Sequence, residues 1–159
     1  MSPRIGFGFD VHRLEPGKDL WLGGILIPSE LGAVGHSDAD TLIHAICDAL
    51  LGAAGLRDIG HHFPDSSPEY RGIDSKLLLA KTIEMLRGKG FEIGNIDSTI
   101  CLQSPKIAPW IEEMQAKLAE VLQIEPGQIN VKATTTEKLG FEGRKEGVSC
   151  YAVALILEV

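Results

Sequence analysis

VSCYAVALILE, residues 148–158, alternates between two sets of apolar side chains and predicts a β-strand that needs cover on both faces. The side chains on one face are Val148, Cys150, Ala152, Ala154 and Ile156, and those on the other are Tyr151, Val153, Leu155 and Leu157. Helices cover one face of a mixed sheet, so we expect the second face to meet another subunit. The alternative is a sandwich in which one chain covers both faces.

The rest of the chain mixes strand and helix patterns, which predicts an α+β fold: a mixed β-sheet with helices packed on one face. Further strands are predicted at Arg4–Phe9, Leu20–Ile27, Glu92–Leu102 and Gln128–Thr134. Helices are predicted from Asp40 to an end marked by Gly52 and Gly55, from Ser75 to Arg87, and from Ala108 to Leu122. Ser37 or Asp38 is the expected N-cap of the first helix, and Gly23-Gly24 predicts a hairpin or a bulge.

The composition predicts a single globular domain, residues 1–159, with 44% hydrophobic residues and without a repeat or linker. The longest strongly apolar stretch, Tyr151–Leu157, is too short to cross a bilayer, and the first residues lack the features of a signal peptide. We therefore expect a cytoplasmic protein.

Cys47, Cys101 and Cys150 are odd in number and lie in apolar segments, which favours reduced core thiols. A net charge of −7 argues against a nucleic-acid partner but leaves room for a small anionic substrate.

Candidate metal ligands occur at two places. Asp10-Val11-His12 follows the first predicted strand, and a period of two puts Asp10 and His12 on one face as a chelating pair. In the stretch HSDADTLIH, residues 36–44, Asp40 and His44 share a helix face and His36 lies just before the helix. Asp10, His12 and His44 with an open fourth position have the ligand set of a catalytic zinc site. The alternative is that these side chains make only ordinary hydrogen bonds.

A polar turn follows the strand that ends near Thr134. The stretch KATTTEK, residues 132–138, offers three hydroxyls, two ammonium groups and one carboxylate, which suits phosphate oxygens and a second metal. The alternative is a solvated strand end. His61-His62 favours a loop role, because adjacent histidines point in different directions.

Four groups of residues recur together with these candidates. They are Gly8 to His12, His36 to Asp40 with His44, Asp58-Ile59-Gly60 with Phe63-Pro64-Asp65, and Lys132 to Phe141 followed by Gly143-Arg144. In order and spacing they resemble the 2-C-methyl-D-erythritol 2,4-cyclodiphosphate synthase family over nearly the whole chain. The resemblance implies a phosphorus–oxygen lyase of the non-mevalonate isoprenoid precursor pathway.

The implied reaction joins two phosphates of one molecule. The 2-phosphate of 4-diphosphocytidyl-2-C-methyl-D-erythritol 2-phosphate attacks the β-phosphate, expels CMP and closes 2-C-methyl-D-erythritol 2,4-cyclodiphosphate. Because the nucleophile belongs to the substrate, positioning and charge neutralisation carry most of the catalysis. The resemblance further implies one Zn²⁺ on Asp10, His12 and His44, and a second divalent cation, Mg²⁺ or Mn²⁺, to which Glu137 contributes.

The resemblance also assigns substrate contacts. His36 and Thr135 match catalytic positions, and Ser37 matches a position that touches phosphate, where the start of the first helix would add amides and dipole. The other matched contacts are Asp10 and His12 at the metal; Asp58, Ile59 and Gly60 near the ribose and erythritol; Phe63, Pro64, Asp65, Ser66 and Ser67 at the methylerythritol; Leu102, Gln103, Ser104, Pro105, Lys106, Ile107 and Ala108 at the cytosine; Thr134, Thr136 and Glu137 at the diphosphate; and Phe141 and Arg144.

Family members are homotrimers whose sheets face each other around the axis and whose active sites lie between chains, so the resemblance implies the same assembly here. Phe9, Phe141, Arg144 and Glu146 match positions near an axial cavity that can take an isoprenoid diphosphate. Ala39 replaces a Gly of many relatives, from which we expect no positive φ at residue 39.

Ser67 replaces an acid found in relatives, which weakens its predicted substrate contact. Two other functions compete with the synthase. A metallo-phosphodiesterase would use the same ligands to activate water. A non-catalytic oligomer would bind metal and isoprenoid phosphates without needing Glu137 or the cytosine loop.

Overall fold

The computed structural model describes residues 2–159, so Met1, the first residue of the stretch examined for a signal peptide, lies outside the described part. The strands are β1 (Pro3–Pro16), β2 (Leu20–Leu22), β3 (Ile25–Ile27), β4 (Leu31–Val34), β5 (Phe91–Cys101), β6 (Ile129–Thr134) and β7 (Gly147–Glu158). The helices are α1 (Thr41–Ala53), α2 (Ile59–His62), α3 (Ser75–Gly88), α4 (Ile111–Leu122) and α5 (Gly140–Gly143).

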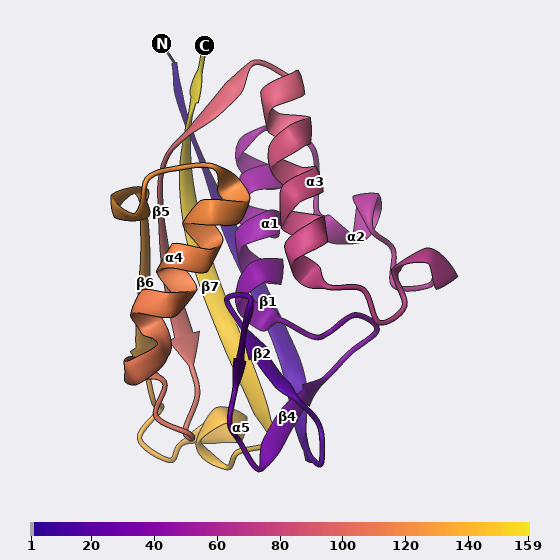
Figure 1. The fold of residues 1–159 in the computed structure, drawn as a ribbon, viewed down its shortest axis with the longest axis vertical. Coiled ribbons are helices and arrows are strands. Elements are labelled where there is room, and N and C mark those ends of the chain that lie inside the picture. Colours follow the sequence, from indigo (N-terminus) through magenta and orange to yellow (C-terminus); the bar gives the residue numbers. More distant parts are fainter. Residues whose placement is uncertain (1) are drawn as a thin grey trace.

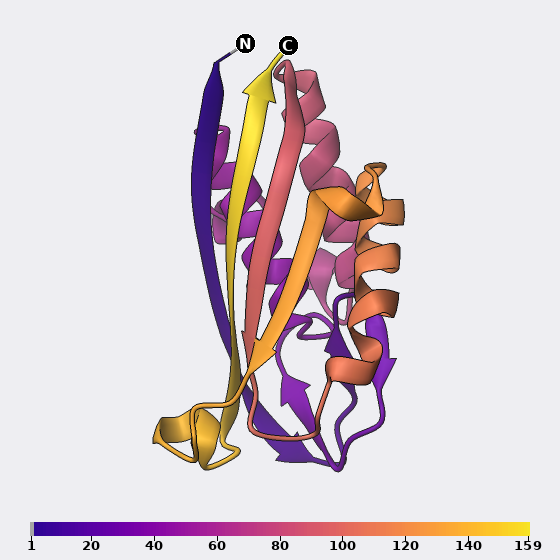
Figure 2. The same ribbon diagram turned by 90° about the vertical axis from the view of Figure 1, so that its left-hand side faces the viewer.

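One mixed sheet organises the molecule, with strand order β4-β1-β7-β5-β6. β7 pairs antiparallel with both β1 and β5, whereas β5 and β6 run parallel. α1, α3 and α4 all lie against the same side of this sheet, and the two termini lie side by side (Figures 1 and 2). The predicted mixed sheet with helices on one face is therefore confirmed.

The two faces of β7 have different surroundings. The residues predicted for one face, from Val148 to Ile156, are at most 1% exposed and form the core with α1. On the opposite face of the sheet, Phe7 of β1 is 62% exposed and Val153 of β7 is 46% exposed. The other large apolar side chains exposed on β1 are Ile5, Phe9 and Val11. A sandwich formed within one chain is therefore wrong, because no second layer covers this face in residues 2–159.

Close packing of α1 on the sheet depends on two glycines of β1. A Cβ at Gly6 or Gly8 would clash with backbone atoms of α1, at Ala49 and Ala45 respectively. The missing side chains let the helix backbone rest directly on the strand. This contact fixes where α1 stands relative to β1.

The predicted first strand is too short. β1 runs to Pro16 rather than ending at Phe9, because its pairing with β7 continues to Arg13 and β4 then pairs with its last residues. Asp10 and His12 therefore lie inside the strand and not at its end. β4, α2 and α5 were also not predicted, because each has only four residues and too short a sequence pattern.

The N-terminus of α1 also differs from the prediction. Its N-cap is Asp40, not Ser37 or Asp38, and the Asp40 carboxylate accepts hydrogen bonds from the amides of Gly23, Gly24 and Ile43. Gly23 and Gly24 have φ values of 60° and 76°, which confirms the predicted hairpin between β2 and β3. One fully buried carboxylate thus fastens this hairpin to the first turn of α1.

Ala39 contradicts the expectation drawn from its departure from Gly, because its φ is 58°. The loop turns sharply here, and side-chain oxygens of Ser37 and Asp38 accept the amides of Ala39 and Asp40. These local bonds hold Ala in a conformation that costs about 1–2 kcal/mol and that Gly adopts freely.

The helix predicted at Ala108–Leu122 begins with a 3-10 turn, and α4 itself starts at Ile111.

The described residues contain no helix long and apolar enough to span a membrane. Cys47, Cys101 and Cys150 are all free. Cys47 and Cys150 are buried as predicted, whereas Cys101 is partly exposed.

Candidate metal site and substrate pocket

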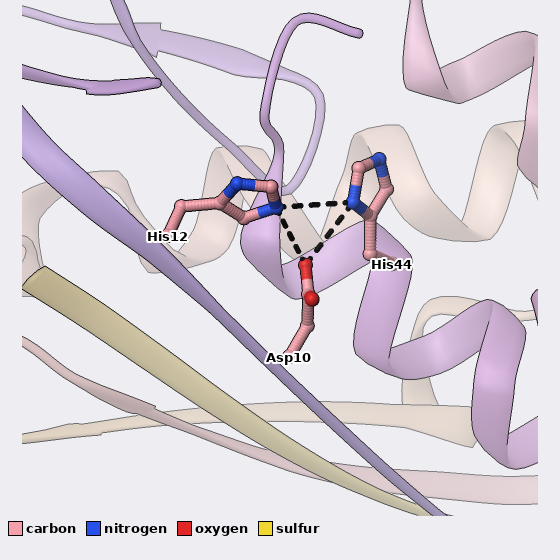
Figure 3. Close-up of side chains that lie close together, drawn as sticks. All are labelled: Asp10, His12 and His44. Atoms are coloured by element: carbon pink, nitrogen blue, oxygen red, sulfur yellow. Dashed lines mark hydrogen bonds and ion pairs between the residues drawn. The ribbon is translucent and has the colours of Figure 1, made fainter. Parts of the chain in front are cut away.

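Two elements bring the predicted metal ligands together. Asp10 and His12 extend from the same face of β1, because side chains two apart in a strand point the same way. His44 extends toward them from the first turn of α1 (Figure 3). One potential ligand atom from each of the three lies within 4.8 Å of the others, so the predicted convergence is confirmed.

The atoms that face one another are Asp10 Oδ2, His12 Nε2 and His44 Nδ1. Asp10 Oδ2 lies 2.8 Å from His12 Nε2 and 3.1 Å from His44 Nδ1, and the two nitrogens are 3.3 Å apart. All three side chains are only partly buried, which leaves the cluster open to a pocket. Carboxylate and imidazole ligands of this kind suit a divalent cation that keeps one position for substrate.

A backbone carbonyl fixes the His12 ring. His12 Nδ1 lies 2.9 Å from the oxygen of Val34, which only accepts hydrogen bonds. Nδ1 therefore carries a hydrogen, and Nε2, which faces Asp10, is the ring nitrogen available to a cation. Gly35 leaves room for the ring, because a Cβ there would lie 2.8 Å from His12 Cε1. The donor set and its orientation therefore fit a metal ion.

The charge of Asp10 matches a ligand role. Burial by itself would raise the pKa of Asp10, but hydrogen bonds and charge interactions with His12 and His44 outweigh it and lower the pKa to about 2. Burial would likewise lower the pKa of His12, but the hydrogen bond and charge of Asp10 raise it. An ionised carboxylate is thus held against the imidazoles throughout the neutral range.

The cluster forms part of the wall of a pocket of about 380 Å³. Predicted site residues on this wall are Asp10, His12, His36, Ser37, His44, Ile59, Gly60, Phe63 and Asp65. Gly35, Tyr70, Ile73 and Leu78 also line it and were not predicted. Tyr70 and Ile73 lie shortly after the predicted contacts Phe63 to Ser67, so their nearness in sequence could have indicated them. Leu78 follows the apolar pattern of the helix predicted at Ser75–Arg87 and was therefore interpreted only as a core residue.

The segment from Asp58 to Ile73 forms one side of the pocket and is attached to the loop before α1. His36 Nε2 donates to the carbonyl oxygen of Ser67 over 2.8 Å, and Gly72 N donates to the carbonyl oxygen of His36 over 2.7 Å. Asp58 is exposed and caps α2 through the amide of His61. The predicted loop role of His61 and His62 is wrong in detail, since both belong to this one-turn helix, where the His62 ring bonds the Leu56 carbonyl.

A second group of predicted contacts lies together at another place. The stretch 102–108 and the turn 134–137 meet where Leu102 N donates to Thr134 O and Lys138 N donates to Gln103 Oε1. Glu137 has a φ of 54° and is exposed in this turn. No residue of either stretch lines the 380 Å³ pocket. These predicted site residues therefore form a group of their own, separate from the residues at the large pocket.

Phe141 and Arg144 form a third location. Phe141 borders a smaller hollow of about 260 Å³ with Val11 and Glu146, and Arg144 pairs with Glu146 at 2.7 Å. His12 lines both this hollow and the pocket that contains the metal cluster, so the two cavities are neighbours.

The large pocket lacks fixed positive side chains. Two carboxylates, Asp10 and Asp65, line it, and no Lys or Arg of the described chain does. A phosphorylated ligand would meet repulsion here unless cations neutralised it. The pocket thus has ligands for a metal ion and an electrostatic need for one.

Comparison with known proteins gives consistent results. Residues 3–157 match the YgbB family. The chain is 64% identical to the 2-C-methyl-D-erythritol 2,4-cyclodiphosphate synthase of Porphyromonas gingivalis strain ATCC 33277, over 97% of this chain and 95% of that protein. It is 42% identical to the bifunctional IspDF from Campylobacter jejuni with a TM-score of 0.96, covering 99% of this chain and 43% of the other. A solved 2C-methyl-D-erythritol-2,4-cyclodiphosphate synthase in its CDP-bound form is 37% identical, with a TM-score of 0.89 over 97% of this chain and 100% of that one.

Proposed function

This chain belongs to the YgbB family, and from that premise we propose that it is a 2-C-methyl-D-erythritol 2,4-cyclodiphosphate synthase. It converts 4-diphosphocytidyl-2-C-methyl-D-erythritol 2-phosphate to the cyclic diphosphate and CMP in the non-mevalonate pathway. Residues 1–159 form one catalytic domain that works in the cytoplasm. The observation that carries the proposal is the convergence of Asp10, His12 and His44 on a pocket that no Lys or Arg of the described chain lines.

The proposed metal ligands come from two places in the chain. Asp10, His12 and His44 would hold Zn²⁺, and Glu137 would contribute to a second cation, Mg²⁺ or Mn²⁺. When bound, these cations supply positive charge to phosphate oxygens. Three of the four proposed ligands lie together in one chain, and Glu137 lies in the separate turn at 134–137.

The chain itself positions the substrate. An oxygen of the 2-phosphate forms a bond to the β-phosphorus while the bond to the oxygen that leaves with CMP breaks, so no protein nucleophile is needed. His36 and Ser37 contact the phosphates from the wall beside the metal ligands, and Thr135 contacts them from its turn. Ile59 and Phe63 place apolar surface along the pocket, which limits the water available for hydrolysis.

We propose that two chains complete each active site. His36 and Ser37 lie at the pocket, whereas the cytosine-side residues 102–108 lie together with the turn 134–137, and no residue of these two stretches lines the pocket in the described chain. In a homotrimer, residues 102–108 of one subunit, which bind the cytosine, lie against the pocket of the next subunit, so that Lys106 meets the diphosphate of the bound substrate. The CDP complex of a relative supports a nucleotide subsite in this fold.

The exposed sheet face supplies the contact surface for this trimer. Phe7 and Val153 lie on it, and the Phe9 and Tyr151 rings pack with centroids 5.1 Å apart. Burying so much apolar surface between three sheets supplies the driving force for assembly. Near the axis, Phe9, Phe141, Arg144 and Glu146 border a cavity for an isoprenoid diphosphate.

Phosphorus NMR of a reaction mixture tests the activity. The purified, zinc-loaded protein is incubated with 4-diphosphocytidyl-2-C-methyl-D-erythritol 2-phosphate and Mg²⁺. CMP and a cyclic diphosphate support the synthase. Linear phosphates would instead show hydrolysis by a phosphodiesterase, and unchanged substrate would show a binding protein, and either result would refute the proposal.

A further inference from the structure

The ring nitrogen of His44 that faces away from Asp10 begins a partly buried chain of hydrogen bonds. His44 Nε2 lies 2.9 Å from Ser75 Oγ, at the first residue of α3. Ser75 Oγ in turn lies at hydrogen-bond distance from Asp38 Oδ1, and the Ser75 amide donates to Asp38 Oδ2 over 2.9 Å. Ser75 is fully buried. Neither Asp38 nor Ser75 lines the pocket, so neither belongs to the group that meets substrate.

The donor and the acceptor of each hydrogen bond follow from the Asp38 carboxylate at the end of the chain. An ionised Asp38 carboxylate only accepts, so the Ser75 hydroxyl must direct its single hydrogen to Asp38. Ser75 Oγ then has only lone pairs left for His44. His44 Nε2 must therefore carry a hydrogen and donate it, so that Nδ1, which faces Asp10 and His12, is the ring nitrogen available to a metal.

Ser37 is consistent with this direction. Its Oγ lies 3.1 Å from His44 Nε2 and accepts the amide of Ala39. It offers a second oxygen to the same N–H. Asp38 also accepts the Asp40 amide, so its orientation is fixed by backbone groups on two sides.

We propose that Asp38 and Ser75 are positioning residues that set the tautomer and the ring orientation of His44 for metal binding. The inference rests on the metal site of the proposed function and goes beyond it by naming residues that act only through His44. Partners of this kind typically change metal affinity by about 10- to 100-fold. The chain also links the start of α3 to the metal, so ligand geometry depends on three elements, β1, α1 and α3.

Zinc affinity tests the proposal. Wild-type protein, Ser75→Ala, Asp38→Asn and the double variant are titrated with Zn²⁺ against a chromophoric chelator. Ser75→Ala removes the acceptor without changing charge. Asp38→Asn keeps the shape but removes the negative charge and one acceptor oxygen, so the Ser75 hydroxyl hydrogen is no longer held toward residue 38 and can turn toward His44. We expect each single variant to weaken zinc binding about 10- to 100-fold. The double variant should lose no more zinc affinity than the single variant with the larger loss, because both residues act through the same hydrogen-bond chain.

Thr82→Val is the matched control. Thr82 is another fully buried hydroxyl of α3, but it donates to the Leu78 carbonyl within the helix and does not reach His44. This variant should bind zinc like the wild type. If Ser75→Ala and Asp38→Asn also do so, the positioning role is refuted while the metal site stands. If the wild type itself binds no zinc, both are refuted.

Nitrogen NMR of the metal-free wild type gives a readout that does not depend on variant folding. Long-range coupling distinguishes a protonated from an unprotonated ring nitrogen. The structure requires Nε2 of His44 to carry a hydrogen, with an unprotonated Nε2 appearing in Asp38→Asn. A wild-type His44 whose Nε2 carries no hydrogen would overturn the proposal.

Discussion

Gly8→Ala should separate the two elements that carry the metal ligands. Gly8 lies on β1 two residues before Asp10, and its missing side chain faces the backbone of α1 beside His44. A Cβ built at Gly8 would lie 2.7 Å from Ala49 N and closer still to Ala45 O, whereas real Cβ atoms essentially never come within 3.0 Å. Both obstacles are backbone atoms, so no side chain can rotate away to make room.

The expected effect is large on metal binding and moderate on stability. To relieve the clash, α1 must move from β1 by about 1 Å, and overpacking of this kind costs about 1–3 kcal/mol of unfolding free energy. Metal–ligand distances tolerate only about 0.2 Å. His44 moves with α1 while Asp10 and His12 stay with β1, so we expect zinc affinity to fall at least about 100-fold.

Gly52→Ala is the matched control on the same helix, because a Cβ there meets nothing within 4 Å. It should keep wild-type zinc affinity and gain about 0.5–1 kcal/mol from the better helix former. The measurements are denaturant unfolding of the metal-free proteins and zinc titration against a chelator. A Gly8→Ala protein with wild-type stability and wild-type zinc affinity would refute the close contact between α1 and β1.

Three further outcomes are expected. His44→Ala should stay folded by circular dichroism but lose zinc and activity, and an active variant with bound zinc by metal analysis would contradict this. The metal-free protein should lose stability as the pH rises above 6.5, because the raised pKa of His12 makes its protonation favour the folded state below that pH. Denaturant unfolding in the presence of a chelator measures how the unfolding free energy changes with pH. An unfolding free energy of the metal-free protein that rises above pH 6.5 would contradict this role of His12. Phe7→Glu should turn the proposed trimer into monomers in light scattering, because the exposed sheet face would then bury a charge; a trimer that persists would point to another contact surface.

The apolar patterns of the chain predicted most of the fold. The period of two in residues 148–158 predicted β7, and helical spacing predicted α1, α3 and α4 to within a few residues. These elements are long enough for the spacing of their apolar residues to distinguish a helix from a strand. β4 has four residues and pairs with β1, a segment distant in sequence, and α2 has only four residues, too few for a helical pattern, so the local pattern carried no signal for either.

The sequence also supplied the chemistry of the site. Asp10 and His12 had to share a face because a strand has a period of two, and His44 was readable as a third ligand from its residue type and the family resemblance. Family positions likewise predicted most of the pocket wall, because such motifs record contacts that spacing alone does not.

Only the tertiary structure decided how these pieces meet. The distances among Asp10, His12 and His44 depend on the packing of α1 against Gly6 and Gly8, which are contacts between segments more than 30 residues apart. The link from Asp38 to Ser75 and the bonds from the Gly23 and Gly24 amides to Asp40 have the same origin. Each is set by groups that approach only after the chain has folded, so no local rule could give it.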